Sequence, residues 1–150
     1  MYDVVISISM QTNLFETPPA SGAIGTIEKW AYGRGHHVVV GVDEAGRGPL
    51  AGPVVAGAVL LPPTTLPSSL GDLDDSKRLS ERVRERLFDS IYEDAMAVGV
   101  GVVDAAKIDQ INILEATRVA MDDAVTQIRD KIAEQIDVLF VDGQVIRERS

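Results

Sequence analysis

The sequence predicts a single α/β domain whose mixed sheet is joined by helical crossovers. The chain has 150 residues, which is enough to bury one hydrophobic core. Runs of β-branched residues alternate with stretches of helical periodicity. The expected order is strand, loop, strand, helix, strand, helix, strand. In this order the two early strands can pair antiparallel before the crossovers begin.

The N-terminal part is expected to lie outside this domain. Residues 1–25 are predicted to be an extension, in part disordered, because the stretch 17–22 is rich in turn residues and lacks periodicity. A short helix is expected over residues 27–32, since glycines follow it and favour a helix end. The domain itself is predicted to span residues 26–150.

The first two strands enclose a glycine-rich loop. Residues 38–42 predict a strand that ends at Asp43 and Glu44. Residues 46–53 contain three glycines and two prolines, so a loop with unusual backbone angles is expected there. Residues 54–61 are almost continuously apolar. This pattern indicates a strand buried on both faces or a hairpin partner of the first strand.

The second half predicts two strands and two main helices. Ser80 is expected to be the N-cap of a helix, since apolar side chains recur at helical spacing after it. Residues 95–103 are rich in valine and predict a strand, after which Asp104 could cap a brief helical turn. A long amphipathic helix is expected over residues 111–135. Residues 138–141 predict a short buried strand.

The composition restricts the kinds of site that the chain can contain. Without cysteine it has no disulfide, thiolate metal site or cysteine nucleophile. No apolar run approaches the ~20 residues that span a bilayer, and the N-terminus does not resemble a secretory signal. We therefore expect a cytoplasmic protein. We also expect a monomer, although the composition does not determine the oligomeric state. The net charge of −9 argues against a general nucleic-acid binder, so any such contact should be local and assisted by metal ions.

The strongest signal is a pair of adjacent acids, Asp43 and Glu44, between a strand and a glycine-rich turn. Neighbouring side chains on a regular strand point to opposite faces, so these two can share a site only if the strand stops here. We expect the loop to turn Glu44 towards Asp43. Hard divalent ions such as Mg²⁺ and Mn²⁺ prefer oxygen ligands of this kind. A solvated acidic turn is the alternative for an isolated pair.

Two polar segments could contact phosphate. Gly46 and Gly48 would let backbone N–H groups approach a ligand, and Arg47 would supply a guanidinium. As a tripeptide, however, these residues also suit a simple tight turn. Lys77 lies just ahead of the helix capped by Ser80, where the helix dipole favours anions. A helix-capping stretch is the alternative there.

A further acid, Asp142, follows the last short strand. Buried acids without partners are costly, so an aspartate in this position is usually paired or a metal ligand. Polar residues at strand ends converge where α/β sheets bind ligands, which would bring together Asp43, Glu44 and Asp142. A simple turn formed with Gly143 is the alternative.

Together these segments resemble the bacterial ribonuclease HII family. Residues 43–54, DEAGRGPLAGPV, are similar to its opening signature, and residues 75–80 to its Asp-Ser-Lys element. Residues 111–121 resemble its long central helix, and residues 141–143 match the strand that bears its third acid. The motifs occur in the family's order, and the first is highly specific.

The resemblance implies a ribonuclease H-like fold and hydrolysis of RNA in RNA–DNA hybrids. It also implies incision on the 5′ side of single ribonucleotides embedded in DNA, leaving 3′-hydroxyl and 5′-phosphate ends. Asp43, Glu44 and Asp142 would then bind Mn²⁺ or Mg²⁺ for two-metal-ion catalysis. The loop of residues 46–48 would sense the ribose 2′-hydroxyl, and Lys77 would contact a backbone phosphate.

The resemblance does not extend to the end of the chain. In the family a fourth acidic ligand and a tyrosine that stacks under the ribose follow the third acid, whereas residues 146–150 do not match that continuation. We therefore expect the C-terminal part of the fold to be missing and the 150-residue chain to retain at most feeble activity. One alternative is an inactive remnant that binds hybrids without cutting them. Another is a different carboxylate-metal nuclease of this fold, such as a junction-resolving enzyme, against which the loop of residues 46–48 argues.

Overall fold

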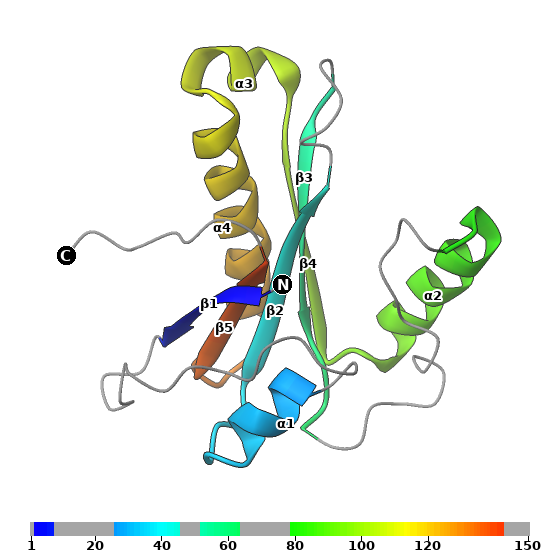
Figure 1. Cartoon of the computed structure of the whole chain (residues 1–150), viewed down its shortest axis with the longest axis vertical. Helices are drawn as coiled ribbons and strands as arrows, with labels where there is room; N and C mark the ends of the chain where they lie inside the picture. The colour runs from blue at the N-terminus through cyan, green and yellow to red at the C-terminus, as the bar shows by residue number, and fades with distance from the viewer. Residues whose placement is uncertain (1, 8–25, 46–51, 64–78, 143–150) are drawn as a thin grey trace.

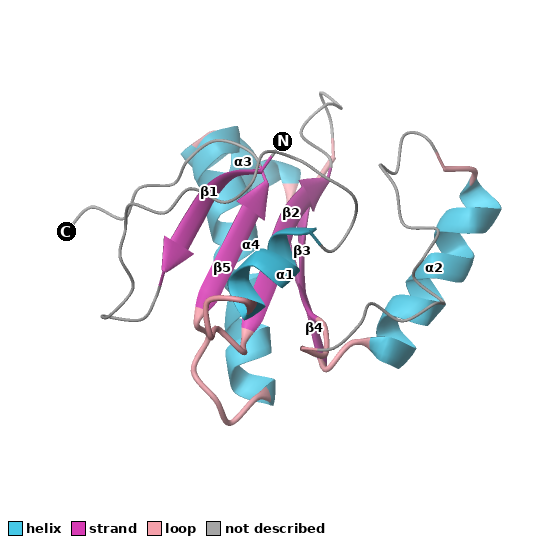
Figure 2. Ribbon diagram, turned by 60° about the horizontal axis from the view of Figure 1, so that its bottom comes forward, coloured by secondary structure: helices cyan, strands magenta, loops and turns pink. Residues whose placement is uncertain are grey.

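In the computed structural model, a single sheet carries α4 on one face and α1 on the other, and α2 lies beyond β4 (Figure 1, Figure 2). The structure describes residues 2–7, 26–45, 52–63 and 79–142. The elements in these ranges are β1 (Tyr2–Ser7), α1 (Thr26–Tyr32), β2 (Val39–Ala45), β3 (Val54–Leu60), α2 (Glu81–Asp94), β4 (Ala97–Val103), α3 (Ala105–Ile111), α4 (Ile113–Lys131) and β5 (Val138–Asp142).

The described strands follow the order β1-β5-β2-β3-β4. The central strand β2 pairs antiparallel with β3 and parallel with β5. β4 pairs antiparallel with β3, and β1 pairs antiparallel with β5. The predicted mixed sheet and the predicted β2–β3 hairpin are therefore confirmed.

Strand β1 was not predicted. It occupies part of the segment that the sequence indicated to be an extension, and it forms the edge of the sheet beside β5. Its β-branched run is only three residues long, Val4 to Ile6. A run of this length is too short to predict a strand from its hydrophobic pattern. The turn-rich stretch 17–22 lies outside the described residues.

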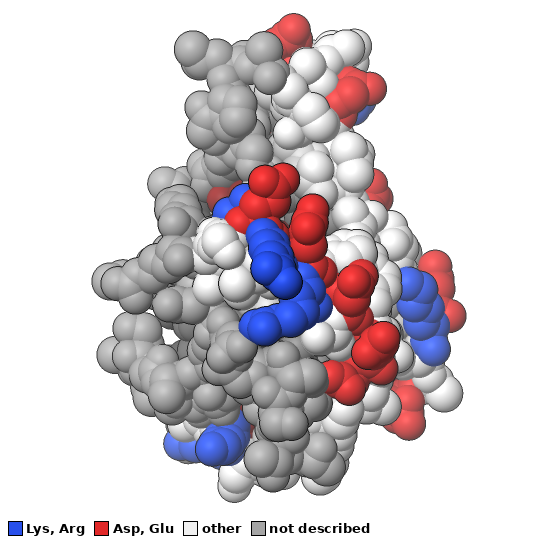
Figure 3. Space-filling model, turned by 90° about the vertical axis from the view of Figure 1, so that its right-hand side faces the viewer, with Lys and Arg blue, Asp and Glu red and all other residues white. Residues whose placement is uncertain are grey.

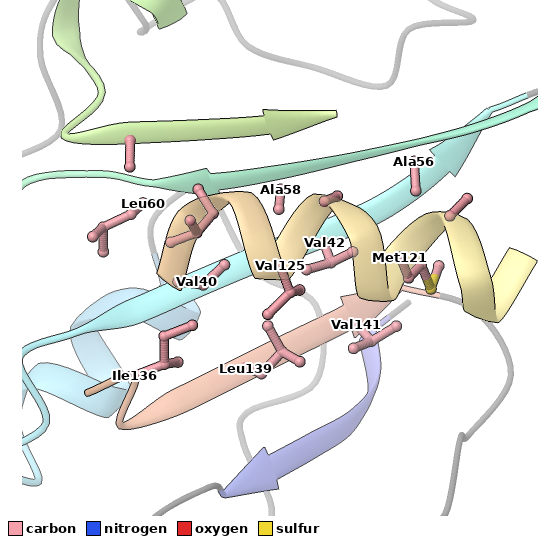
Figure 4. Packing of buried hydrophobic residues seen from close by; sticks show 14 of the residues in the cluster. Val40, Val42, Ala56, Ala58, Leu60, Met121, Val125, Ile136, Leu139 and Val141 are labelled. Atoms are coloured by element: carbon pink, nitrogen blue, oxygen red, sulfur yellow. The ribbon is translucent and has the colours of Figure 1, made fainter. Parts of the chain in front are cut away.

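The larger hydrophobic core lies between α4 and the sheet (Figure 4). A smaller cluster lies on the opposite face, where Ala31 of α1 packs with Val39, Val138 and Phe140. β2 and β5 thus contribute buried residues to both faces, which explains why their sequences are almost continuously apolar. In β3 only alternate residues are buried, so of the two interpretations of residues 54–61 the hairpin partner is the one confirmed. The labelled members of the larger core are Val40, Val42, Ala56, Ala58, Leu60, Met121, Val125, Ile136, Leu139 and Val141.

Helix α4 packs on β4 at backbone distance. A Cβ added to Gly99 would lie 2.0 Å from the carbonyl oxygen of Ala124, and one added to Gly101 would lie 1.9 Å from that of Ala120. Neither glycine has a positive φ, so both are needed for space rather than for backbone freedom. Small residues on both elements therefore set the distance between helix and sheet.

The same helix covers the outer edge of β4. The side-chain amide of Gln127 accepts the N–H of Val100 at 3.1 Å and donates to its carbonyl at 2.7 Å. Lys131 Nζ donates to the carbonyl of Val98. These backbone groups belong to an edge strand, where unpaired N–H and C=O groups invite pairing with another chain. Residues of α4 protect this stretch of the edge from such pairing.

The predicted helix over residues 111–135 is split and shorter than expected. Asn112 has a φ of 70°, and its side-chain oxygen accepts the N–H of Glu115 at 3.0 Å as the N-cap of α4. The helix then ends at Lys131. The apolar period continues across the break, so periodicity alone could not locate it. Asparagine combines tolerance of positive φ with a capping side chain, which explains why the break occurs there.

The two predicted N-caps of the other helices are confirmed. The Ser80 hydroxyl accepts the N–H of Val83 at 3.4 Å, and the Asp104 carboxylate accepts the N–H of Lys107 at 2.8 Å. None of the described helices is long and apolar enough to cross a membrane.

Asp137 joins the starts of the two central strands. Its Oδ2 accepts the N–H groups of His37 and Val38 at 2.8 and 3.0 Å. Burial by itself raises the pKa of this carboxyl. The hydrogen bonds from Val38 and His37, together with the positive charges of His36 and His37, outweigh burial and hold the pKa below its usual value of 3.8.

We predict that Gly101→Ala lowers the free energy of unfolding by about 3 kcal/mol or more, because the new methyl group must displace helix backbone rather than a side chain. Urea unfolding of the two proteins measures the difference. Gly57→Ala is the matched control, since a Cβ there meets nothing within 4 Å. Its effect should stay below about 1 kcal/mol. An equal loss in both variants would contradict close packing as the cause.

The lowered pKa of Asp137 predicts a pH-dependent contribution to stability. Because the folded value lies below the unfolded one, the contribution is present above pH 3.8 and is lost as the pH falls through the folded pKa. Asp137→Asn should therefore destabilise the protein at pH 7, and the gap to wild type should shrink on acidification. Urea unfolding of both proteins across this range provides the measurement. A gap that is constant with pH would refute the assignment.

Candidate functional site

Asp43 and Asp142 occupy neighbouring positions near the carboxyl ends of two parallel strands. β2 and β5 are paired in register up to Val42 and Val141. Asp43 and Asp142 are the next residues on these strands, and both still belong to them. The fold therefore brings together two acids that are far apart in sequence.

Both positions also belong to the same face of the sheet. Val42 and Val141 lie in the core beneath α4. Phe140, two residues before Asp142, packs instead with α1 on the other face. Because successive strand residues alternate between faces, positions 43 and 142 both lie on the face that α1 partly covers.

The side chain of Asp43 is exposed, and its Oδ1 accepts the N–H of Glu44 at 2.7 Å. The residue opposite it on β3 is Gly57, which has no side chain. A glycine within a valine-rich strand can mark a place where a ligand or another backbone approaches closely. This signal was present in the sequence, but the sequence analysis did not use it.

The expected position of Glu44 is wrong. The strand does not stop before it but continues to Ala45, which pairs with Val55. Glu44 lies opposite the fully buried Ala56, and its Oε2 is buried as well. Continued pairing with β3 therefore keeps Asp43 and Glu44 on opposite faces in this structure. The loop does not turn them towards each other.

The other predicted site residues, namely Gly46, Arg47, Gly48 and Lys77, lie outside the described residues. The side chain of Asp142 is not described either. Within the described part of the chain, no group of three or more His, Cys, Asp or Glu side chains is arranged to hold a metal ion.

Comparison with known sequences identifies the relatives of the chain. Residues 40–147 match the family model described as Ribonuclease HII. The chain is 46% identical over 138 residues to the ribonuclease HII of Pelobacter propionicus, covering 92% of this chain and 59% of that protein. It is 51% identical over 116 residues to the ribonuclease HII of Acetivibrio thermocellus, covering 77% of this chain and 43% of that protein.

Comparison with solved structures supports the fold. A variant of Bst-RNase HIII aligns with a TM-score of 0.65 and 20% identity, covering 94% of this chain and 46% of that one. Bst-RNase HIII in complex with Mn²⁺ aligns with a TM-score of 0.60 and 18% identity, covering 89% of this chain and 44% of that one. At these identities the likeness concerns the fold alone, and it confirms the predicted ribonuclease H-like fold.

The chain spans about half the length of the curated relatives that it matches. The sequence identity to these relatives, the family model over residues 40–147 and the ribonuclease H-like fold agree. The chain belongs to the ribonuclease HII family.

Proposed function

We propose that the protein is an endonuclease that hydrolyses RNA in RNA–DNA hybrids and at ribonucleotides embedded in duplex DNA. The observation that carries this proposal is the pairing of β2 with β5, which places Asp43 beside Asp142 on one face of the sheet. The names of the curated relatives support the same activity. The ends would be a 3′-hydroxyl and a 5′-phosphate, as the family resemblance implies.

The donor chemistry at these strand ends fits Mn²⁺ or Mg²⁺. Carboxylate oxygens are the ligands that hard divalent ions prefer, and the exposure of Asp43 gives such an ion access from solvent. Two such ions, when bound, supply activation of water and stabilisation of the leaving oxygen. A solved structure of the same fold, Bst-RNase HIII, was obtained in complex with Mn²⁺.

The residues of this chain have distinct roles in the proposal. Asp43 and Asp142 hold the ions, and the absence of a side chain at Gly57 leaves room for the sugar–phosphate backbone beside Asp43. The loop of residues 46–48 follows β2 directly and would sense the 2′-hydroxyl that separates RNA from DNA. Lys77 would contact a phosphate. The roles of the loop and of Lys77 rest on the family motif.

Glu44 is proposed as the third acidic ligand, also on the motif alone. To bind an ion together with Asp43, its carboxylate would have to leave the face covered by α4. A change of backbone twist after Asp43 would achieve this at the end of β2, where only Ala45 continues the strand. Either the Glu44 carboxylate binds the ion or it stays on the face covered by α4. Substitution separates these two possibilities, because Glu44→Gln lowers metal affinity only if the carboxylate reaches the ion.

We predict that Mn²⁺ binds the chain and that Asp43→Asn weakens this binding at least tenfold. The estimate follows from the loss of about 10- to 100-fold when even an outer partner of a metal ligand is removed. Titration followed by Mn²⁺ electron paramagnetic resonance measures free and bound ion. Asp130→Asn is the control, since it removes an equal charge from an exposed position on α4, on the opposite face. Equal affinities in all three proteins would exclude Asp43 as a ligand.

We predict Mn²⁺-dependent cleavage of a DNA duplex containing one ribonucleotide, with Asp43→Asn at least about 100-fold slower than wild type. Gel analysis of the labelled strand gives the rate and the cleavage position. That the 150-residue chain is only feebly active stays a prediction. Because a low rate is expected, the assay uses stoichiometric protein and long incubation. Hybrid binding that is unaffected by Asp43→Asn, without any metal-dependent turnover, would instead indicate a hybrid-binding remnant.

A further inference from the structure

Arg34 is held in a fixed position at the end of α1 although it is exposed to solvent. Its guanidinium carbon lies 4.3 Å from the centroid of the Trp30 ring, and its Nη1 donates to the Trp30 carbonyl at 3.4 Å. Stacking on tryptophan restricts a side chain that would otherwise sample many rotamers. The positive charge is thereby kept at a defined place on the surface.

The backbone around Arg34 is also well anchored. Gly33 and Arg34 donate to the carbonyls of Lys29 and Ala31 at 2.9 and 3.0 Å. Gly35 has a φ of 85°, which suits glycine and lets the chain turn back towards β2. The Trp30 ring contacts Phe140 of β5 edge-on, with centroids 6.4 Å apart. Through this ring contact the guanidinium is fixed relative to the sheet.

This anchored arginine lies on the face of the sheet that carries Asp43. Helix α1 packs on Val39 and Phe140, and position 43 has the same strand alternation as Val39. Four residues of strand separate Val39 from Asp43, which is about 13 Å. That distance corresponds to about four nucleotide steps along one strand of a duplex at ~3.4 Å each. A nucleic acid that is cut at Asp43 and runs along β2 could therefore reach Val39, on which α1 packs.

The sequence around Arg34 is less acidic than the chain as a whole. Residues 29–42 contain Lys29, Arg34 and two histidines but no acid, in a chain with a net charge of −9. Two acids lie close to this stretch, Glu28 just before it and Asp137, whose carboxylate accepts the N–H groups of His37 and Val38.

Helix α2 is the other candidate for a basic surface. It carries three arginines among five acids, and Figure 3 shows its basic side chains bordered by a row of acidic ones. The arginines of α2 are therefore largely compensated by neighbouring acids, whereas residues 29–42, which include Arg34, contain no acid.

We propose that Arg34, supported by Trp30, binds a backbone phosphate of the nucleic acid whose scissile bond lies at Asp43. The inference rests on the proposed function and adds a contact some nucleotides away from the chemistry. A pre-positioned guanidinium loses little side-chain entropy when it binds, which favours this use. Helix α1 precedes the segment matched by the family model, which begins at residue 40.

The test measures binding of a fluorescently labelled RNA–DNA hybrid by anisotropy, with EDTA present and at several salt concentrations. A lost phosphate contact reduces the slope of log affinity against log salt by about one unit and weakens binding uniformly across sequences. Arg34→Ala should show this change and bind about fivefold more weakly at low salt. Arg34→Lys should restore the slope. Trp30 is the single tryptophan of the chain, so its emission should change when wild type is titrated with the hybrid.

Arg129→Ala is the matched control, because it removes the same charge from an exposed position on α4, across the sheet from α1. Its salt slope should equal that of wild type. Equal slopes for Arg34→Ala and wild type, or an equal loss in Arg129→Ala, would overturn the inference, as would absence of hybrid binding by wild type. If cleavage depends on Asp43 but the salt slope of Arg34→Ala equals that of wild type, the proposed function is retained and only the Arg34 contact is excluded. A purely structural role would lower the melting temperature of Arg34→Ala without changing its slope.

Discussion

The close contact of α4 with β4 at Gly99 and Gly101 is the constraint on which the rest of the structure depends. Because these two residues have no side chain, the helix backbone lies directly on the strand. The helix is then near enough for Met121 and Val125 to reach the larger core that α4 shares with the central strands. Interiors of this density do not relax freely around added atoms, so a single methyl group at this contact affects the whole layer.

That packing fixes the strands that carry the acids. β2 is held by β3 on one side and by β5 on the other, and the parallel register with β5 is set by valines buried beneath α4. A register slip of one residue would turn every one of these valines to the other face, which the core does not allow. The positions of Asp43 and Asp142 are thus fixed by apolar residues of the core.

Much of this arrangement could be predicted from the sequence, and the exceptions have physical causes. Local signals, such as the caps at Ser80 and Asp104 and the apolar runs of β3 and β5, depend on neighbouring residues and were sufficient. The break at Asn112 leaves the apolar period unchanged, so a periodic pattern could not reveal it. The extension of β2 past Asp43 depends on pairing with β3, which is a tertiary interaction. The convergence of Asp43 and Asp142 could be predicted because α/β sheets generally bind ligands at the carboxyl ends of their strands, where polar residues come together.

Because successive residues of a strand point to opposite faces, the sheet has one face that packs on α4 and another that carries α1 and Asp43. The face of β2 that α4 covers must be apolar at Val40 and Val42. The residues between them point to the other face and need not pack against α4. At the start of the strand Val39 packs against α1, and four residues later Asp43 lies on the same face. A helix that anchors an arginine and a strand end that presents an acid therefore share one surface by geometry alone. On this face Val39 and Asp43 are separated by the rise of four strand residues, about 13 Å, which neither side-chain motion nor loop length can alter.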